Sequence, residues 1–397
     1  MKKRIFVCAE IIFPRGAAGS NLTLCYCKLF KKMGYDVTVI GLGGAEKGDF
    51  DDESQTYEYE GIRYTTIASG AGVVGKINSK ILSGKNTIEK LRSFGITKDD
   101  LIMIYASNGV YIKKIGDFAR KNGIKAFNIV VEWHQPFQYP FGKYDIRYRS
   151  NEKGFNKYVP QIGNVVAISK LLDTAFKERG CHTTIIPVMI DYERNKDMFS
   201  DRTVSDTEPR NFIYAGNPFG KDDMLTMLRG IELLSEDIRK RMKFYWVGVK
   251  REIAVSNLKE NAYLLDELSD CIEIREWLNY DELLKLYEKM DFLYFSREDN
   301  TVSNAGFPSK VPEAMLQGLV PVINRVGDCP DYLTDGEDSF IFDDDTPEKC
   351  CEGLSRAVEV SSDKLRNMRS SAFECAKGKF DYSAWDKVMS EFLINLK

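Results

Sequence analysis

The sequence predicts an α/β protein made of two doubly wound units, each with a parallel sheet. Three observations support this fold class. Strand-like and helix-like patterns alternate from one end of the chain to the other. At 397 residues, the chain exceeds the length of one typical domain. A polar stretch without apolar periodicity, Asp191–Arg210, separates two halves of similar size and is predicted to be a linker.

The first half, residues 1–190, starts with a basic run and a short apolar segment, as signal peptides do. Because Glu10 interrupts the apolar segment, we interpret Arg4–Cys8 as the first strand. A helix is predicted over about Ser20–Met33. Apolar runs predict further strands at Asp36–Ile40, Ile62–Ile67, Leu101–Tyr105, Phe127–Val131, Val165–Ile168 and Thr184–Pro187.

The second half, predicted to span residues 211–378, restarts the alternation. Its predicted strands are Asn211–Ala215, Phe244–Val247, Ile272–Arg275, Asp291–Phe295 and Leu319–Ile323. Its predicted helices lie near Asp222–Leu234, Tyr280–Lys289 and Lys310–Gln317. Open parallel sheets bind ligands beyond the carboxyl ends of their strands, so two such units predict a central cleft with loops from both halves.

Residue usage limits the classes of site that the chain can carry. No apolar run approaches the roughly 20 residues that span a bilayer. None of the nine cysteines forms a C-x-x-C pair, which favours reduced cytosolic thiols over a zinc site. With only His134 and His182 present, a multi-histidine metal site is nearly excluded.

The net charge of −3 conceals an asymmetry between the halves. Residues 1–190 hold 28 Lys and Arg against 18 Asp and Glu, a balance of +10, so the remainder carries −13. Much of the basic excess lies in Lys76–Arg92, Lys113–Lys125 and Lys143–Lys157. A basic half favours an anionic partner, such as a membrane surface or an acidic acceptor. The alternative is a solvated surface without a partner.

The most informative segment is Gly306–Ile323, which reads GFPSKVPEAMLQGLVPVI. A glycine turn precedes a short helix that carries Glu313, Gly318 ends the helix, and a buried strand follows. Exposed N–H groups at such a turn, with Lys310 beside them, suit a phosphate, and the carboxylate of Glu313 suits a sugar hydroxyl. The segment therefore predicts a pocket for a phosphorylated sugar or nucleotide, and an ordinary loop–helix–strand unit is the alternative.

In each half, the loop that directly follows the first predicted strand is a further candidate. Gly16 and Gly19 lie before the first helix, where small residues let a ligand approach, although a plain turn explains them equally well. The second loop runs from Gly216 to Lys221, and this lysine could reach a diphosphate together with Lys310. Neither loop matches a dinucleotide fingerprint or a P-loop.

Two more side chains are candidates because each lies at the end of a predicted strand. Arg297 could add a third cation, or it could form a salt bridge with Glu298 or Asp299. His134 could accept a proton from a substrate or donate a hydrogen bond to it, and a structural role is the alternative. We interpret His182 as structural.

In sequence order, these segments resemble the family 4 retaining glycosyltransferases of the GT-B fold, which use nucleotide-diphosphate sugars. The similarity spans essentially the whole chain. Gly306–Ile323 is similar to the donor-site signature of that family, and bacterial surface-polysaccharide enzymes with a Gly-Phe-Pro-Thr/Ser-Lys pattern are closer still. The matching segments are Gly16–Gly19, Val165–Ser169, Ile186–Val188, Gly216–Lys221 and Gly306–Ile323.

The resemblance implies a role for each candidate residue. Glu313 is expected to bind the donor ribose, Lys221 to neutralise the leaving diphosphate, and His134 to lie beside the sugar on the acceptor side. Lys221, His134 and Arg297 form the implied catalytic set. The implied donor-binding residues are Gly19, Gly216, Lys221, Arg275, Gly306, Phe307, Pro308, Ser309, Lys310 and Glu313. Residues 379–397 are expected to form a helix that crosses back to the first half.

The chain departs from the family pattern at two positions. Ala305 stands where the family commonly has a glutamate that contacts the sugar, and Asn217 stands where it commonly has an arginine. Arg297, Lys310 or both are expected to replace the missing charge. The departures also allow a second function, a GT-B protein with reduced activity that serves as a binding partner. A sugar epimerase or a phosphorylase on the same fold is a third alternative.

The resemblance implies transfer of a sugar from a UDP- or GDP-linked donor to a glycan or polyprenyl-linked acceptor, with retention of configuration. No metal and no cofactor are expected, because cations of the protein stabilise the leaving group. No nucleic acid partner is expected. The expected location is the cytoplasm, with peripheral contact to the inner face of an anionic membrane through the basic half.

Overall fold

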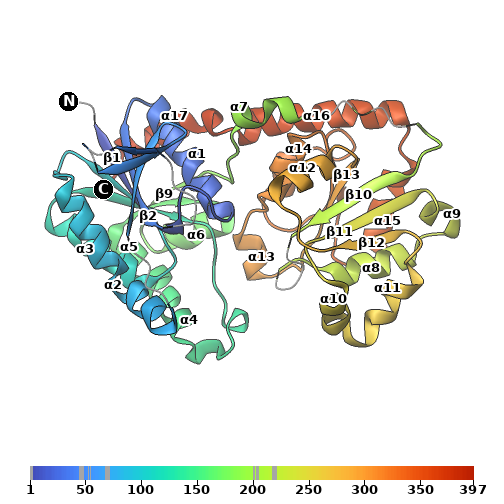
Figure 1. Ribbon diagram of the computed structural model, residues 1–397, viewed down its shortest axis with the longest axis horizontal. Coiled ribbons are helices and arrows are strands. Elements are labelled where there is room, and N and C mark those ends of the chain that lie inside the picture. Colours follow the sequence, from blue (N-terminus) through green and yellow to red (C-terminus); the bar gives the residue numbers. More distant parts are fainter. Residues whose placement is uncertain are drawn as a thin grey trace. The chain divides into compact units, whose positions relative to one another are not determined.

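The computed structural model describes residues 3–43, 49–51, 53, 55–67, 72–199, 202, 205–216 and 221–397, with only the backbone described for residues 72–81 and 280. The chain forms two compact units (Figure 1). The first unit combines Met1–Ile190 with Tyr382–Lys397, and the second comprises Asp191–Asp381. The segment 191–210 therefore lies in the second unit, and it contains the short helix α7 (Tyr192–Asn195). No helix in the described part of the chain has both the length and the apolarity to cross a membrane.

The sheet of the first unit has the strand order β3-β4-β5-β2-β1-β6-β7-β8-β9. Pairing is parallel throughout, except where β4 pairs with β3 and β5 in antiparallel fashion. The strands are β1 (Arg4–Ile12), β2 (Asp36–Leu42), β3 (Asp49–Asp51), β4 (Thr56–Tyr59), β5 (Ile62–Ile67), β6 (Leu101–Tyr105), β7 (Lys125–Val130), β8 (Asn164–Ala167) and β9 (His182–Ile185).

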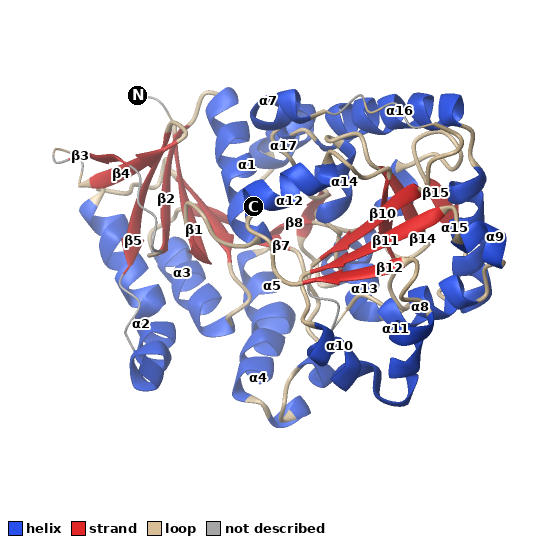
Figure 2. Ribbon diagram, turned by 45° about the vertical axis from the view of Figure 1, so that its right-hand side comes forward, coloured by secondary structure: helices blue, strands red, loops and turns tan. Residues whose placement is uncertain are grey.

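Helices pack around this sheet (Figure 2). The main ones are α1 (Ala18–Lys32), α2 (Gly72–Ser93), α3 (Gly109–Lys121), α4 (Ile146–Lys153), α5 (Val159–Ile162), α6 (Lys170–Glu178) and α17 (Asp386–Ile394). Short 3-10 turns are η1 (Pro136–Gln138), η2 (Gly142–Tyr144) and η7 (Tyr382–Trp385), and a π-turn, η3 (Gly154–Tyr158), follows α4.

The C-terminal helix α17 is part of the first unit. The ring of Phe392 on this helix lies 5.6 Å from the ring of Phe127 on β7. It also stacks on His182, with the ring centroids 5.0 Å apart. His182 is thus the first residue of β9 and packs against an aromatic side chain, as its structural interpretation requires.

The sheet of the second unit is parallel, with the strand order β12-β11-β10-β13-β14-β15. Its core combines aliphatic and aromatic side chains, with Trp246 and Tyr294 fully buried. The strands are β10 (Arg210–Ala215), β11 (Met242–Val247), β12 (Ile272–Arg275), β13 (Phe292–Phe295), β14 (Val320–Asn324) and β15 (Phe340–Phe342). The two sheets, parallel except at β4, confirm the predicted α/β fold class.

The helices of the second unit alternate with these strands. Side chains of Asp223, Asn279 and Thr346 cap the first turns of three of them, since each accepts a backbone N–H hydrogen bond. Besides α7, the α-helices are α8 (Met224–Glu232), α9 (Glu236–Arg239), α10 (Arg251–Leu258), α11 (Leu264–Glu267), α12 (Tyr280–Tyr287), α13 (Thr301–Ala305), α14 (Lys310–Met315), α15 (Pro347–Glu359) and α16 (Ser362–Phe380). The 3-10 helices are η4 (Lys196–Met198), η5 (Lys259–Tyr263) and η6 (Cys329–Tyr332).

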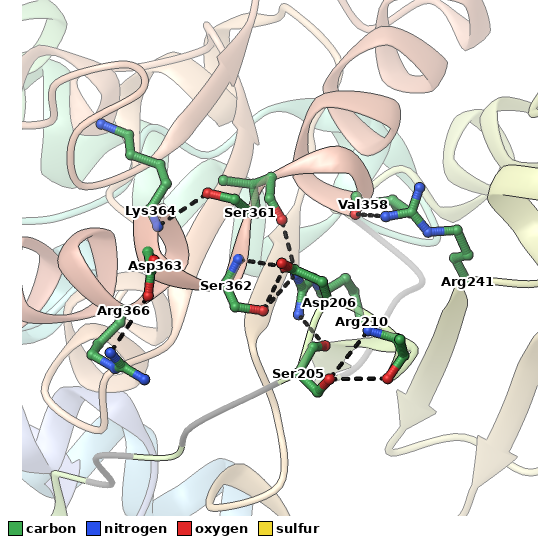
Figure 3. A network of polar contacts seen from close by, with 12 residues as sticks. Ser205, Asp206, Arg210, Arg241, Val358, Ser361, Ser362, Asp363, Lys364 and Arg366 are labelled. Atoms are coloured by element: carbon green, nitrogen blue, oxygen red, sulfur yellow. Dashed lines mark hydrogen bonds and ion pairs between the residues drawn. The ribbon is translucent and has the colours of Figure 1, made fainter.

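A polar network joins the start of β10 to the connection between α15 and α16 (Figure 3). Arg210 is 1% exposed and donates a 2.8 Å hydrogen bond to the carbonyl oxygen of Val360. Asp206 accepts hydrogen bonds from the backbone N–H and the hydroxyl of Ser362. These bonds give the buried guanidinium its partners and fix the first strand of the sheet against α16.

Candidate active site

The candidate donor site lies where the strand order of the second unit reverses. Strand β10 is the first strand in sequence; β11 and β12 lie on one side of it, and β13 to β15 lie on the other. The crevice beyond the ends of β10 and β13 is therefore the topological switch point, where open α/β sheets bind their ligands. The loops after these two strands carry Gly216, Lys221 and Arg297.

A single carboxylate, Asp222, joins the candidate cations at this point. Nζ of Lys310 lies 2.8 Å from Oδ2 of Asp222, and Nε of Arg297 lies 2.8 Å from Oδ1. The hydroxyl of Tyr214 also donates to Oδ2, at 2.7 Å. Nζ of Lys310 lies 4.2 Å from the centre of the Tyr214 ring, which adds a cation–π contact. The partner of Arg297 is thus Asp222, and the alternative that named Glu298 or Asp299 is wrong.

The network is largely removed from water. Only 7% of the Asp222 side chain, 12% of the Arg297 side chain and 20% of the Lys310 side chain is exposed. Burial alone would raise the pKa of Asp222, but Lys310 and Arg297 overcome this effect and hold it below its ordinary value. Burial lowers the pKa of Lys310, while Asp222 acts in the opposite direction.

Glycine backbones lie directly against this network. A Cβ atom at Gly216 would lie 3.0 Å from Nζ of Lys310, and the φ angle of this glycine is +146°. A Cβ atom at Gly248 would lie 2.7 Å from the carbonyl oxygen of Gly216. The N–H of Gly248 in turn donates to the carbonyl oxygen of Arg275, at 2.9 Å. Gly216, Lys310 and the end of β12 therefore form one closely packed surface.

The segment Gly306–Ile323 forms most of the predicted turn, helix and strand. Helix α14 covers Lys310–Met315 and is shorter than predicted, and Gly318, with φ +80°, follows it before β14. Glu313 is half-buried on α14 and acts electrostatically on Lys310. A short helix that was not predicted, α13, directly precedes the glycine turn and ends at Ala305. The side chain of Ala305 is fully buried.

The turn residues Gly306, Phe307, Pro308 and Ser309 differ in their surroundings. Gly306 lies near the guanidinium of Arg297, because a Cβ atom placed on it would be 3.6 Å from one terminal nitrogen. The ring of Phe307 packs against Tyr332 and Phe380, so this side chain serves the core. Pro308 is buried and Ser309 is half-buried at the start of α14.

Two predicted donor residues lie at the margins of this network. The first, Lys221, directly precedes Asp222 and is half-buried. Asn217, the departure from the family pattern in the same loop, lies outside the described residues. Arg275 ends β12, where its Nε donates to Glu273 at 2.7 Å and its guanidinium lies 4.9 Å from the Tyr245 ring centre.

A cavity of about 180 Å³ lies in the first unit, at the carboxyl ends of β1, β6 and β7. Its lining includes Glu10, Tyr105, Glu132, His134 and Asn151. Strands β1 and β6 are neighbours on opposite sides of the reversal in strand order, so this cavity also lies at a switch point.

His134 lines this cavity, and Glu132 lies beside it. Nε2 of the histidine lies 3.5 Å from Oε2 of Glu132. Burial and the charge of Glu132 raise the pKa of Tyr105 to about 12, so its phenol keeps its proton at neutral pH. The pair of a carboxylate and an imidazole can accept a proton from a hydroxyl group bound in the cavity.

Gly19 also lies in the first unit, near the start of α1. A Cβ atom at this position would lie 3.0 Å from the hydroxyl oxygen of Tyr105. The missing side chain of Gly19 therefore makes room for the phenol of Tyr105. This close contact explains why a glycine occupies position 19 and does not require a bound ligand there.

Sequence reasoning missed Asp222, Glu10 and Glu132. A signal for each was present, because Glu10 and Glu132 follow predicted strands as His134 does. Asp222 stands beside Lys221 in a glycine-containing loop, and a buried lysine or arginine needs a counter-charge. The pairing itself joins residues 75 and 88 positions apart, which no local pattern reveals.

The comparisons with known proteins agree with this architecture. Residues 209–359 match the family model of glycosyl transferases group 1. No curated protein sequence matches the chain. These matched residues include the strands β10 to β15 and all members of the Asp222 network.

Solved structures share the fold across the whole chain. A glycosyltransferase from Rickettsia africae superimposes with a TM-score of 0.68 at 12% identity, covering 99% of each chain. The Anabaena protein HepE in complex with UDP and glucose gives a TM-score of 0.65 at 14% identity, covering 99% of this chain and 100% of that one. The E. coli trehalose-6-phosphate structure bound with UDP-2-fluoro glucose gives 0.70 at 11% identity, covering both chains fully.

The chain therefore has the GT-B fold, and its second unit matches the glycosyl transferases of group 1 over 209–359, which together support a glycosyltransferase.

Proposed function

We propose that this protein is a retaining glycosyltransferase, independent of metal, that moves a sugar from a UDP- or GDP-linked donor to a glycan or polyprenyl-linked acceptor. The family 4 assignment and a role in surface-polysaccharide synthesis at the inner membrane face belong to the same proposal. One observation carries it. Two largely buried cations, Lys310 and Arg297, converge at the switch point of the unit that matches group 1 glycosyltransferases.

The donor diphosphate would bind at these cations. A buried cation interacts more strongly with an anion than an exposed one, because less water screens the charge. Lys310, Arg297 and Lys221 would then stabilise the charge that develops on the leaving diphosphate, which is the largest contribution in this kind of catalysis. Glu313 would accept hydrogen bonds from the ribose, and Gly216 would leave room for the phosphates.

The acceptor would bind in the cavity of the first unit. Its polar lining, with Glu132, His134 and Asn151, offers hydrogen-bonding groups to sugar hydroxyls. Because the leaving diphosphate can accept the proton of the attacking hydroxyl, no protein nucleophile is needed for substitution on the same face of the sugar. His134 would orient that hydroxyl or receive its proton.

The named neighbours support a nucleotide-sugar donor. HepE is complexed with UDP and glucose, and the E. coli structure holds UDP-2-fluoro glucose. Their sequence identities of 14% and 11% show a shared fold only, so a nucleotide-sugar donor for this chain, UDP- or GDP-linked, is part of the proposal.

The test is a titration of the purified chain with UDP, GDP and ADP, followed by turnover with the matching nucleotide sugars. We expect one nucleoside diphosphate to bind, its sugar donors to be consumed with an acceptor present, and the anomeric configuration to be kept in the product. Chelation of metal ions should leave the rate unchanged. Inversion of configuration would contradict the retaining mechanism, and absence of binding by all three nucleotides would contradict the donor site.

The second candidate is a GT-B protein with reduced catalysis that acts as a binding partner. Ala305 favours it, because this residue is fully buried and brings no carboxylate to the place where the family commonly has one. Under this alternative the nucleotide titration gives binding or none, while sugar transfer is absent with every donor and acceptor pair.

A further inference from the structure

Four large apolar side chains stand exposed after β7, three of them before α4 and the fourth at its first residue. They lie within residues 137–149, which we name the aromatic loop. Phe137 is 67%, Phe141 is 74%, Tyr144 is 66% and Ile146 is 83% exposed. In the described part of the chain, no other ten-residue stretch carries as many exposed large hydrophobic residues. Such a concentration marks an interaction surface, whereas single exposed apolar residues do not.

Cations alternate with these side chains. Nζ of Lys143 lies 5.3 Å from the centre of the Tyr144 ring, and the guanidinium carbon of Arg149 lies 5.6 Å from the same point. Arg147 lies over Tyr139 at 5.5 Å. The aromatic loop contains one acidic residue, Asp145, which is 4% exposed and bonded to Arg147. The charge that the loop presents to its surroundings is therefore positive.

The backbone of the loop is folded, so the exposed side chains do not result from a lack of structure. The N–H of Gly142 donates to Tyr139 and the N–H of Tyr144 donates to Phe141, at 2.9 and 3.0 Å. Asp145 then caps α4 by accepting from the N–H of Arg147, at 2.9 Å. The apolar side chains are held outward on a preformed support, which reduces the entropic cost of docking.

We propose that the aromatic loop inserts its apolar side chains into the surface of a bilayer that contains anionic lipids. Aromatic rings favour the interface between headgroups and acyl chains, and neighbouring lysine and arginine residues attract anionic headgroups. This proposal does not depend on glycosyl transfer. The basic charge of residues 1–190 indicated contact with an anionic membrane without naming a segment, and the proposal assigns this contact to the aromatic loop.

The alternation of charges favours a bilayer over a second copy of the chain. Two copies of the loop facing each other would bring Lys143, Arg147 and Arg149 against like charges, which opposes association. Cores of protein interfaces are also depleted of lysine. A bilayer instead offers an apolar layer and an anionic layer at neighbouring depths, which matches apolar and basic side chains in one segment.

The loop leads directly into the cavity of the first unit. Helix α4 begins at Ile146, within the aromatic loop, and contributes Tyr148, Asn151 and Glu152 to the cavity lining. Docking of the loop would therefore place this cavity near the lipid headgroups, where a lipid-linked molecule is available.

Co-sedimentation of the full chain with vesicles tests the proposal. Vesicles of phosphatidylcholine alone are compared with vesicles that also contain phosphatidylglycerol. We expect preferential binding to the anionic vesicles, decreasing with salt. The double variant Phe141→Ser/Ile146→Ser should lower the partition coefficient about tenfold or more. The variant Lys143→Gln/Arg149→Gln should weaken binding to anionic vesicles only.

Matched controls separate docking from misfolding. Trp277, in the second unit, is 80% exposed, so Trp277→Ser removes a comparable apolar side chain elsewhere and should leave binding unchanged. Phe141→Trp should shift its fluorescence to shorter wavelength on adding anionic vesicles. Equal binding by all variants, or no binding by the native chain, would overturn the proposal. So would a dimer in analytical ultracentrifugation that is lost in the Phe141→Ser/Ile146→Ser variant without vesicle binding.

Discussion

Nζ of Lys310 donates a 2.8 Å hydrogen bond to Oδ2 of Asp222, and both side chains are largely buried. The same carboxylate is bonded to Arg297 through its other oxygen. Asp222 therefore supplies the negative charge that the two cations need when no anion is bound. A diphosphate that bound to these cations would compete with Asp222 for them.

The competition predicts the effect of Asp222→Asn. Without the carboxylate, Lys310 and Arg297 are available to an anionic ligand, so affinity for the bound nucleoside diphosphate should rise about tenfold. Stability should fall by about 3 kcal/mol, because two poorly solvated cations lose their counter-charge. Isothermal titration and thermal unfolding measure the two effects.

The matched control for this variant is Glu298→Gln, which removes an exposed carboxylate one residue from Arg297. It should change neither affinity nor stability appreciably. Weaker nucleotide binding in Asp222→Asn, with unchanged stability, would show that Asp222 helps the ligand and does not compete with it.

Two lysines of the second unit, Lys221 and Lys310, are predicted to affect turnover alike and stability differently. Lys221→Ala should reduce the rate of sugar transfer by on the order of a hundredfold or more, because it removes a contact with the leaving group. Lys310→Ala should reduce turnover similarly and also lower the melting temperature, because Asp222 would lose a buried partner. Initial rates at saturating donor, with melting curves, separate the two lysines.

Lys250 provides the control for both lysine variants. This lysine is exposed, and its ammonium lies 3.6 Å from Glu276 and is not one of the partners of Asp222. Lys250→Ala should leave turnover unchanged. If turnover in Lys221→Ala equals that of the native chain, Lys221 has no part in the mechanism.

The sequence predicts the buried parallel strands well, because each appears in the sequence as a short run of apolar residues that ends at polar or turn-forming residues. Strands Leu101–Tyr105, Ile62–Ile67 and Ile272–Arg275 have the predicted bounds. The antiparallel strands β3 and β4 were missed, since they have only three and four residues and neither forms a continuous apolar run. Helix α13 was missed because five residues are too few to show helical periodicity.

Site residues that lie at the ends of strands could be predicted from the sequence. Residues whose role depends on an ion pair between distant parts of the chain could not. His134, Lys310 and Arg297 were found because each follows a strand or begins a helix. Asp222 was not, because its role arises from contacts with Arg297 and Lys310 that form only when β10 and β13 become neighbours. Phe307 was assigned to the donor through its backbone N–H, which stays a prediction, and the packing of its ring against Phe380 is a contact that only tertiary structure creates.

The two histidines predict opposite phenotypes. His134→Gln should lower turnover about a hundredfold through loss of a proton acceptor, with unchanged nucleotide affinity. Its position near Glu132, at the edge of a cavity, makes a large loss of stability unexpected. Steady-state rates, nucleotide titration and melting curves together measure this.

His182→Gln is the internal control, because His182 stacks on Phe392 and is not among the residues that line the cavity. This variant should lower the melting temperature and leave turnover per folded molecule unchanged. Equal turnover losses in the two variants would assign His134 a structural role.

The cap of α4 predicts a dependence on acid. Hydrogen bonds from Arg147 hold the pKa of Asp145 at about 2, below its ordinary value of 3.8. Because the folded state lowers this pKa, the stabilisation by Asp145 is complete above about pH 5 and is lost as pH falls through about 2. Hydrogen exchange of residues 146–153 in the native chain and in Asp145→Asn should therefore differ at neutral pH, and the difference should shrink as pH falls through about 2.

Helix α6 offers a reference within the same molecule, because its cap is Ser169, whose hydroxyl does not titrate in this range. The ratio of exchange rates between native chain and variant should stay near one for α6 at every pH. If the ratio for α4 persists undiminished at pH 2, the carboxylate charge does not hold the helix. If the ratio for α4 falls toward one in acid, protonation of Asp145 loosens this helix, which contains the end of the aromatic loop and part of the cavity wall. Vesicle binding and acceptor binding should then decline over the same pH range.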